Sequence, residues 1–259
     1  MISEQAIRAH LNHEKLNIKI FDVIDSTNSA AKRMALSHDT QGGFAPTLLV
    51  AKEQTLGRGR MGRRFVSNLG GIYMSLVYVT EKPLSDAVSI TTATASVVAE
   101  AIESIIGAPM KIKWVNDIYN DRGKVAGILA EAVSVGERIA VIVGIGINTG
   151  ASDFPEEIQN VASSIGELDG QDGLLIAKIA DGLLYCAENP KDRSYMEAYR
   201  KRFMLKGKTV DLIRGGERVG GGKVIGVDDN GGLLLLPDGQ ADPIVIQSGE
   251  VSVRESKIE

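Results

Sequence analysis

Apolar residues follow two different periods along the first 205 positions, and each period predicts its own kind of element. Short runs that are apolar, or that alternate apolar with polar residues, are typical of strands, and they span 18–24, 47–52, 72–80, 111–115, 118–120, 124–133 and 133–148. Apolar residues three or four positions apart predict helices, over 1–13, 29–37, 85–106, 155–168 and 174–203. Strands and helices are therefore interspersed in this part of the chain.

The pattern changes after Gly207. Short apolar strands then alternate with glycine turns, without any helix-length pattern, over 209–213, 218–227, 232–236, 243–247 and 250–254. Five short strands within about 50 residues are typical of a small barrel or an open sandwich. We therefore predict two domains with a boundary near Leu205, comprising residues 1–205 and 206–259.

Composition narrows the class of protein. The chain has 259 residues, of which 44% are hydrophobic and 24% charged, as in ordinary soluble globular proteins. We find no apolar run of the ~18 residues that a membrane-spanning helix needs, so we expect no membrane association. The single cysteine, Cys186, cannot form an internal disulfide and is interpreted as a packed core thiol. A chain of this kind belongs in a reducing, cytoplasmic compartment.

Charge and histidine content argue against two kinds of site. The net charge of −4 excludes binding of polyanions through bulk charge, although a local basic patch remains possible. The histidines at positions 10, 13 and 38 do not have the spacing of a zinc site with Cys186. We interpret His10 and His13 as surface histidines. P-loop and Ser-His-Asp patterns are not found.

One loop is positively charged although the chain as a whole is negatively charged. Residues 52–64 contain five basic residues and one acid, a local charge of +4. Gly57, Gly59 and Gly62 let the backbone approach a ligand, and the arginines provide forks for phosphate or carboxylate. These glycines also match the spacing of a dinucleotide-binding motif, but a loop follows where that motif requires a helix. We interpret the segment as a mobile, anion-collecting loop; the alternatives are a solvated basic loop and an RNA-binding segment.

Two further motifs carry groups suited to the same chemistry. Lys111 and Lys113 share one face of a strand, and Asp117 lies in a tight turn. Lys124 begins an otherwise apolar strand, where a lysine can reach into a site, although a single lysine at such a place is more often a solvent-facing charge. The glycines of the segment 144–148 lie on an apolar strand, which indicates close approach of a ligand to the backbone.

Taken in order, these segments resemble the biotin protein ligases, also called biotin–[acetyl-CoA carboxylase] ligases. The resemblance covers about residues 15 to 255, and its glycine–arginine loop and lysine motifs are specific when taken jointly. It rests on the segments 25–28 (DSTN), 54 (Q), 57–63 (GRGRMGR), 113–117 (KWVND), 124–129 (KVAGIL), 144–148 (GIGIN) and 249–254 (GEVSVR).

The resemblance implies a fold and an activity. The fold is α+β: a mixed sheet backed by helices, related to class II aminoacyl-tRNA synthetase cores, followed by a small SH3-like β-barrel. The activity is ATP- and Mg²⁺-dependent formation of biotinyl-5′-AMP with release of pyrophosphate, followed by transfer of biotin to a lysine of a biotin carboxyl carrier protein. Such an enzyme is expected in the cytoplasm as a monomer or weak homodimer, with the carrier of acetyl-CoA carboxylase or a related carboxylase as its partner.

The resemblance also implies roles for individual residues. Residues implied to bind biotin are Ser26, Thr27, Asn28, Gln54, Arg58, Gly59, Arg60, Lys124 and Gly127. Residues implied to bind ATP are Arg58, Arg60, Arg63, Phe65, Asn116, Lys124, Asn148 and Arg254. The implied catalytic residues are Lys124, Arg60 and Asp117, the last to orient or deprotonate the acceptor lysine. Magnesium is implied only as a substrate-bound ion, without a metal site of the protein's own.

The chain departs from the family pattern at two positions, and two alternatives stay open. Val115 stands where many members have proline, and Phe65 where many have tryptophan, although Phe65 can still stack on adenine. Because the chain begins almost at the catalytic domain, without a DNA-binding helix-turn-helix, we expect neither a repressor function nor DNA binding. The alternatives are a lipoate ligase or transferase, and a non-catalytic nucleotide- or RNA-binding module. The polar set at 26–28 and Gln54 suits a ureido ring better than a dithiolane.

Overall fold

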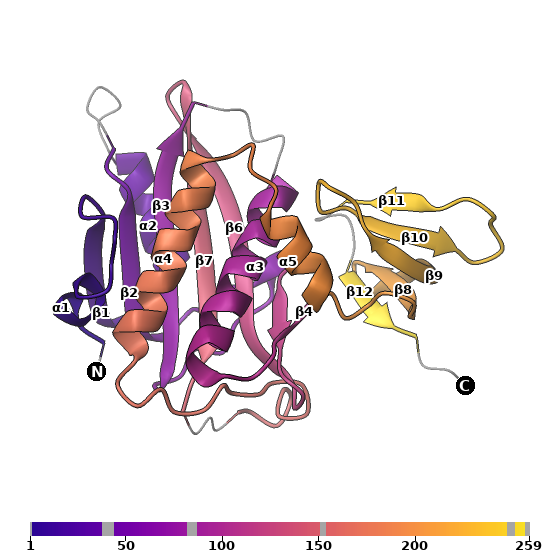
Figure 1. Ribbon diagram of the computed structural model, residues 1–259, viewed down its shortest axis with the longest axis horizontal. Helices are drawn as coiled ribbons and strands as arrows, with labels where there is room; N and C mark the ends of the chain where they lie inside the picture. The colour runs from indigo at the N-terminus through magenta and orange to yellow at the C-terminus, as the bar shows by residue number, and fades with distance from the viewer. Residues whose placement is uncertain (1, 38–43, 82–86, 151–153, 248–251, 257–259) are drawn as a thin grey trace.

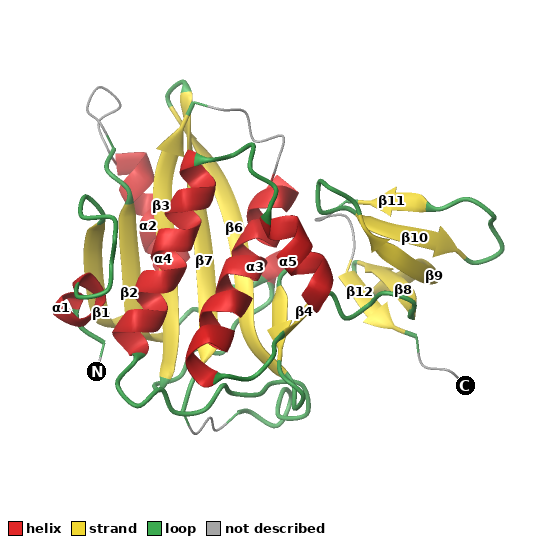
Figure 2. Ribbon diagram, viewed as in Figure 1, coloured by secondary structure: helices red, strands yellow, loops and turns green. Residues whose placement is uncertain are grey.

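The computed structural model describes residues 2–37, 44–81, 87–150, 154–247 and 252–256. In these residues the strands form two β-sheets, and helices and loops connect the strands (Figures 1 and 2). The helices are α1 (Glu4–Arg8), α2 (Thr27–Ser37), α3 (Ala87–Ile106), α4 (Asp172–Glu188) and α5 (Tyr195–Arg202). The strands of the first sheet are β1 (Asn17–Ile24), β2 (Thr47–Gln54), β3 (Gly71–Thr80), β4 (Lys111–Lys113), β5 (Asp117–Tyr119), β6 (Lys124–Val135) and β7 (Arg138–Asn148). Those of the second sheet are β8 (Thr209–Arg214), β9 (Glu217–Val227), β10 (Leu233–Pro237), β11 (Ile244–Ile246) and β12 (Ser252–Glu255).

The first sheet is mixed, with the strand order β1-β2-β3-β7-β6-β5-β4. Strands β1 and β2 are parallel, and the other neighbouring pairs are antiparallel. Helices α3, α4 and α5 cover one face of this sheet, and α2 lies behind it in Figure 1. The expected α+β fold with a mixed sheet backed by helices is therefore confirmed.

Alternation along the strands gives the sheet an apolar face and a second face, here called the polar face, on which polar residues lie beside a smaller apolar cluster. Successive side chains of a strand point to opposite faces. In β3, Ile72, Met74 and Leu76 join the large core cluster with α3 and α4, whereas Val77 joins a smaller cluster with α2. Ser75, between Met74 and Leu76, is fully buried on the face of α2. The same alternation in β5, β6 and β7 leaves glycines and charged residues on that second face.

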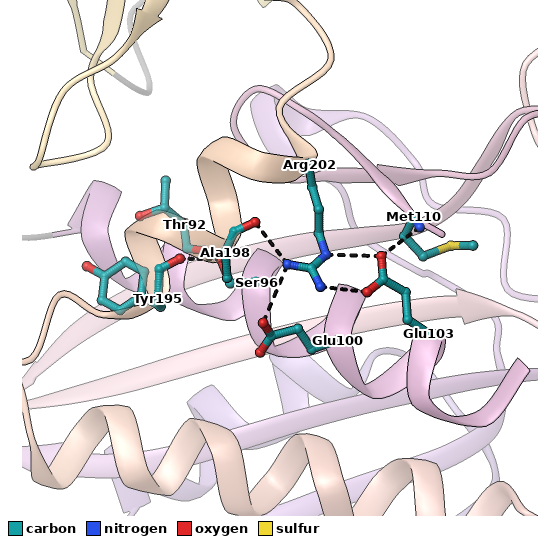
Figure 3. Close-up of polar contacts among 8 residues, drawn as sticks. All are labelled: Thr92, Ser96, Glu100, Glu103, Met110, Tyr195, Ala198 and Arg202. Carbon is teal, nitrogen blue, oxygen red and sulfur yellow. Dashed lines mark hydrogen bonds and ion pairs between the residues drawn. The ribbon is translucent and has the colours of Figure 1, made fainter. Parts of the chain in front are cut away.

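On the apolar face, one arginine joins helices α3 and α5 (Figure 3). The Arg202 guanidinium donates to both carboxylate oxygens of Glu103, at 3.0 and 2.5 Å, and to the Ala198 carbonyl at 2.9 Å. It also lies 3.4 Å from a carboxylate oxygen of Glu100. Burial alone would raise the pKa of Glu103, but the hydrogen bonds from Arg202 and from the Met110 N–H together lower it. The Arg202 guanidinium is therefore neutralised by two carboxylates and also hydrogen-bonded to a carbonyl.

The second sheet is antiparallel, with the order β11-β10-β9-β8-β12, in agreement with the expected small C-terminal β unit. Its β9–β10 turn is in contact with the first sheet. Trp114 donates its indole N–H to the Gly231 carbonyl at 2.9 Å, and Arg200 donates to the Val227 carbonyl at 3.2 Å and pairs with Asp229. The exact domain boundary stays a prediction: α5 ends at Arg202 and β8 begins at Thr209.

Two sequence-based expectations about helices are wrong. Residues 155–168 form turns, and Ala162 makes a parallel bridge with Lys124; this segment pairs with a strand instead of burying a helical face. The helix expected over 174–203 is two helices, since residues 189–194, which include Pro190, separate α4 from α5. Proline lacks the N–H that a helix interior needs.

Three smaller expectations also change. The window Ser89–Ile106 of α3 is long and apolar enough to cross a membrane by length and composition, and 61% of it is buried inside the protein; a core helix packed on several sides passes the same test. His13 is partly buried, and Asp181, 2.8 Å from its Nδ1, raises its pKa. Cys186 is only partly buried, and burial raises its pKa to about 11.

Candidate active site

A cavity of about 590 Å³ opens on the polar face of the first sheet. Its walls come from the start of α2, the end of β2, the loop after β2, the β4–β5 turn, β6, β7 and β12. Every residue that the sequence predicted for the site lines this cavity. They are Ser26, Thr27, Asn28, Gln54, Arg58, Gly59, Arg60, Arg63, Phe65, Asn116, Asp117, Lys124, Gly127, Asn148 and Arg254.

One end of the cavity is a neutral hydrogen-bond network. The Gln54 amide oxygen accepts from the backbone N–H of Thr27 at 2.8 Å and from its hydroxyl at 3.2 Å, and the Gln54 amide nitrogen donates to Ser67 at 2.9 Å. Ser75 lies 2.7 Å from the Thr27 hydroxyl and 2.6 Å from the Asn28 amide oxygen. The network fixes donors and acceptors that would bind a flat polar ring without carrying net charge.

Asn28 is held by three residues on two strands, β6 and β3. Its amide nitrogen donates to the Leu129 carbonyl at 3.2 Å and to a carboxylate oxygen of Glu131 at 2.9 Å, and its oxygen faces Ser75. The neighbouring strand position must be glycine, because a Cβ on Gly144 would lie 1.9 Å from the Asn28 amide oxygen. The sequence indicated that a ligand approaches the glycines of β7; at Gly144, the group that approaches is Asn28.

The glycine–arginine loop closes on itself. Gly59 donates its N–H to the Arg63 carbonyl at 2.7 Å, and Phe65 donates its N–H to the Gly57 carbonyl at 3.0 Å. Gly57 is required by the close packing of this turn, since its Cβ would lie 2.3 Å from the Phe65 carbonyl oxygen. A segment that the sequence marked as mobile therefore has a defined closed conformation, which places its arginines at separate points of the cavity.

Three arginines of the loop contact three different elements. Arg58 forms a two-pronged ion pair with Glu131 on β6, at 3.0 and 3.2 Å. Arg60 donates to the Asn116 amide oxygen at 3.0 Å, and burial lowers the pKa of its guanidinium. Arg63 donates to the Ser252 hydroxyl of β12 at 3.0 Å. The loop thus spans from the first sheet to the second.

Lys124 and Asp117 form the charged centre of the cavity. The Lys124 ammonium lies 2.6 Å from Asp117 Oδ1, and each side chain is about one-quarter exposed. The ammonium also lies 5.7 Å from the centre of the Phe65 ring. Lys124 is therefore held between a carboxylate and an aromatic face.

Phe65 and two asparagines occupy positions that refine their predicted roles. The Phe65 ring covers Gly127 and Gly146, whose Cβ atoms would lie 3.0 and 2.4 Å from it, so Phe65 forms part of the cavity floor. The Asn148 amide donates to the Ser163 carbonyl at 2.9 Å and to the Lys124 carbonyl at 3.4 Å. The Asn116 amide donates to the Ile128 carbonyl at 3.0 Å.

The sequence interpretation missed Ser75, Ser67 and Glu131. Ser75 and Glu131 stand at alternate positions of strands whose neighbours are apolar, and that alternation was a usable signal for their face. The cavity also includes Tyr119, and burial raises the pKa of Tyr119 to about 12. Lys113 lies over its ring, with the ammonium 5.9 Å from the ring centre.

The described residues contain no cluster of three or more histidine, cysteine or carboxylate side chains that could hold a metal ion. Among the described cavity-lining residues, Asp117 supplies the one carboxylate, against the cations Arg58, Arg60, Arg63, Arg64, Lys113, Lys124 and Arg254. A metal ion would have to enter with an anionic ligand. The arrangement suits the joining of two anions beside a neutral polar pocket.

Comparisons with known proteins point the same way. The biotin/lipoate A/B protein ligase family matches residues 20–148. A bifunctional ligase/repressor BirA of Bacillus spizizenii is 35% identical over 247 residues, or 90% of this chain and 74% of that protein. A biotin–[acetyl-CoA-carboxylase] ligase of Paracoccus denitrificans is 28% identical, covering 88% of this chain and 96% of that protein. The structure is similar to that of the biotin protein ligase from Aquifex aeolicus in complex with biotin and ATP, with a TM-score of 0.73 and 30% identity over 93% of this chain and 99% of that one.

Proposed function

Because the chain belongs to the biotin/lipoate A/B protein ligase family, we propose that it is an ATP-dependent biotin protein ligase. It activates biotin as biotinyl-5′-AMP and transfers biotin to a lysine of a biotin carboxyl carrier protein. The observation that carries this conclusion is one cavity that combines the neutral network at Thr27, Asn28 and Gln54 with a cluster of cations around Lys124.

The neutral end suits the ureido ring of biotin. A ureido group has one carbonyl acceptor and two N–H donors, so it needs both kinds of partner in fixed places. The Thr27 and Ser75 hydroxyls and the Gln54 amide are held by one another at 2.7–3.2 Å, so little order remains to be imposed on binding. A dithiolane ring offers no such groups, and its binding would add no hydrogen bond to those that these polar groups already make with one another.

The cationic end suits the first half-reaction. A biotin carboxylate oxygen forms a bond to the α-phosphorus of ATP, and the bond from that phosphorus to the pyrophosphate oxygen breaks. The two reactants are both anions, so fixed positive charges must offset their repulsion and the charge that develops. Lys124 and Arg60, which approach from β6 and from the loop, are the groups we assign to the reacting atoms, and Arg63 and Arg254 we assign to the phosphates.

Magnesium fits this site as part of the nucleotide substrate. Mg²⁺ is commonly held by one or two carboxylates together with substrate phosphates and water. Asp117 is already paired with Lys124, and the described residues supply no further acid cluster. We therefore assign the ion to the ATP phosphates, where it withdraws charge from the leaving pyrophosphate.

The second half-reaction needs a proton acceptor. The acceptor lysine amine attacks the acyl carbon of the adenylate, the bond to AMP breaks, and the amine loses a proton. A free lysine has a pKa of about 10.4, so at neutral pH a nearby carboxylate assists the attack. Asp117 is the carboxylate of the cavity, and we assign this role to it together with the positioning of Lys124.

We propose further that the acceptor is the carrier domain of a biotin-dependent carboxylase. The name of the Paracoccus denitrificans relative, which specifies acetyl-CoA carboxylase, supports this choice. We also propose a cytoplasmic monomer or weak homodimer. A gel-filtration measurement with and without biotin and ATP tests the oligomeric state.

A two-step assay tests the function. Protein, ATP, Mg²⁺ and biotin are mixed and pyrophosphate is measured, and labelled biotin is then followed onto a purified carrier domain. The expected result is biotin-dependent pyrophosphate release and labelling of one carrier lysine. Lipoate is the matched control, and equal or faster use of lipoate would assign the site to a lipoate ligase. Nucleotide binding without pyrophosphate release would instead indicate a non-catalytic module.

A further inference from the structure

Glu131 is in contact with two cavity residues although it does not itself line the cavity. It lies on β6, directly opposite Ile142 of β7, and its side chain is 21% exposed. One of its carboxylate oxygens accepts from the Asn28 amide at 2.9 Å and from Arg58 at 3.2 Å, and the other forms an ion pair with Arg58 at 3.0 Å. A single carboxylate therefore connects α2, β6 and the glycine–arginine loop.

The contact with Asn28 decides which way that amide points. Glu131 and the Leu129 carbonyl both accept hydrogen bonds, so the two amide hydrogens of Asn28 must face them. The amide oxygen then faces Ser75, which also reaches the Thr27 hydroxyl. Asn28 is 4% exposed, so a lost partner is not replaced by bulk water. The direction of the hydrogen bonds in the neutral network thus depends on Glu131 together with the Leu129 carbonyl.

The contact with Arg58 anchors the loop. Arg58 follows Gly57, where the hairpin closes against the Phe65 N–H. A guanidinium fork on a carboxylate fixes orientation as well as distance, so the pair holds this side of the hairpin against β6. Because both prongs of Arg58 bind Glu131, its charge is offset before a substrate arrives. The reacting anions then depend on the other cations that line the cavity, which outnumber Asp117, the one carboxylate among its described lining residues.

We propose that Glu131 is a positioning residue that sets the neutral pocket through Asn28 and anchors the covering loop through Arg58. The inference rests on the proposed ligase function and deepens it, since it makes one carboxylate responsible both for recognition of the ureido ring and for retention of the adenylate. It also makes Arg58 a loop anchor instead of a contact of the substrate carboxylate.

Two substitutions separate the two roles. Glu131→Gln keeps an oxygen that accepts from Asn28 but removes the charge that holds Arg58. This variant should keep the KM for biotin within about twofold, yet it should release adenylate and raise biotin labelling of a bystander protein such as serum albumin by about fivefold or more, since charged hydrogen bonds are the stronger ones. Glu131→Ala also removes one of the two acceptors of the Asn28 amide nitrogen and leaves only the Leu129 carbonyl, and the KM for biotin should rise by about tenfold.

A double-mutant cycle keeps the test independent of folding defects. Arg58→Ala should release as much adenylate as Glu131→Gln does. The double variant should release no more adenylate than either single variant, because both substitutions remove the same anchor. The matched control is Asp22→Asn, which removes the carboxylate of the exposed Lys52–Asp22 pair on the same sheet, 2.7 Å apart. This control should match the parent protein in KM, labelling and melting temperature.

The outcomes are distinguishable from failure of the ligase assignment. If the parent protein forms no biotinyl-adenylate, the ligase function fails, and the proposed role of Glu131 fails with it. If the parent is active and both Glu131 variants show parental KM and labelling, only the role of Glu131 fails. If the Glu131 variants have a lower melting temperature but unchanged KM and labelling, the role of Glu131 is purely structural and the proposal is overturned. If the double variant releases as much adenylate as the sum of the two single variants, the proposal that Arg58 and Glu131 form one shared anchor is overturned.

Discussion

The two faces of the seven-stranded sheet use the same strands but treat charge in opposite ways. On the face covered by α3, α4 and α5, the buried side chains are apolar and the Arg202 guanidinium has Glu103, Glu100 and a carbonyl as partners (Figure 3). On the other face, glycines expose the sheet floor, and cations from the loop and from β6 outnumber the acids around them.

The difference in charge pairing indicates that one face of the sheet stabilises the fold and the other binds substrates. Partners that satisfy every charge stabilise a fold, because an unpaired buried charge is costly. A site that must bind two anions instead needs fixed positive charge that the protein itself does not neutralise. Asp117 and Glu131 offset part of that charge at Lys124 and Arg58, and the other cations that line the cavity supply the excess. Substitutions on the two faces should therefore change different properties.

The largest effect is expected at Lys124. Replacing Lys124 with alanine removes the ammonium assigned to the reacting carboxylate and phosphate, and adenylate formation should fall by about 10²-fold or more. Pyrophosphate release measures this step. Melting temperature should change little, since this charge serves substrate and not the core. Near-parental pyrophosphate release would remove Lys124 from its assigned role.

Gly144 tests the floor of the polar face. Gly144→Ala places a methyl group 1.9 Å from the present position of the Asn28 amide oxygen, so the neutral network must shift. Overpacking of this kind costs about 1–3 kcal/mol, and the KM for biotin should rise more than the KM for ATP. Gly226→Ala is the control, because a Cβ there meets nothing within 4 Å. Equal effects on both substrates would argue against the assignment of this end to biotin.

The apolar face should respond in stability alone. Glu103→Gln weakens the two bonds from Arg202, of 3.0 and 2.5 Å, and hydrogen bonds to charged groups contribute about 1.5–3 kcal/mol. Denaturant unfolding should show that the free energy of unfolding falls by an amount at or below the lower end of that range, since the glutamine still supplies a neutral acceptor. The KM values and the rate of pyrophosphate release should stay at parental levels. A changed KM for biotin would show that the two faces are coupled.

The smallest effect concerns His13, at the edge of the molecule. Hydrogen bonding to Asp181 raises the folded-state pKa of His13 above its ordinary value of 6.5. Its stabilising contribution is therefore fully present below about pH 6.5 and is lost as the pH rises through the raised pKa. Because the pair lies near the surface, with the His13 side chain 29% exposed, solvent screens it and the contribution is about 0.5 kcal/mol or less. The His13→Asn variant should lose this pH dependence of unfolding, whereas His10→Asn should retain it.

The site was predictable from sequence to the extent that its residues share a motif. The loop 57–63, the segment 113–117 and Lys124 carry chemical types that only an anion-binding site needs together, and their charged residues line one cavity. Strand alternation likewise predicted that Lys111 and Lys113 share one face of a strand, because side-chain direction in a strand depends only on position. The C-terminal change to short strands between glycine turns was visible for the same local reason.

The remaining features depend on contacts between distant positions. The bonds of Asn28 reach Ser75, Leu129 and Glu131, which lie 47, 101 and 103 positions away in the chain. A local pattern carries no information on such pairings. The same holds for residues 155–168, where pairing with Lys124 replaced the expected helix. The sequence alone determined which groups the chain has and which face each strand position takes; only the tertiary structure decided which charges are offset and which stay available, since that depends on distances between elements that the chain brings together on folding.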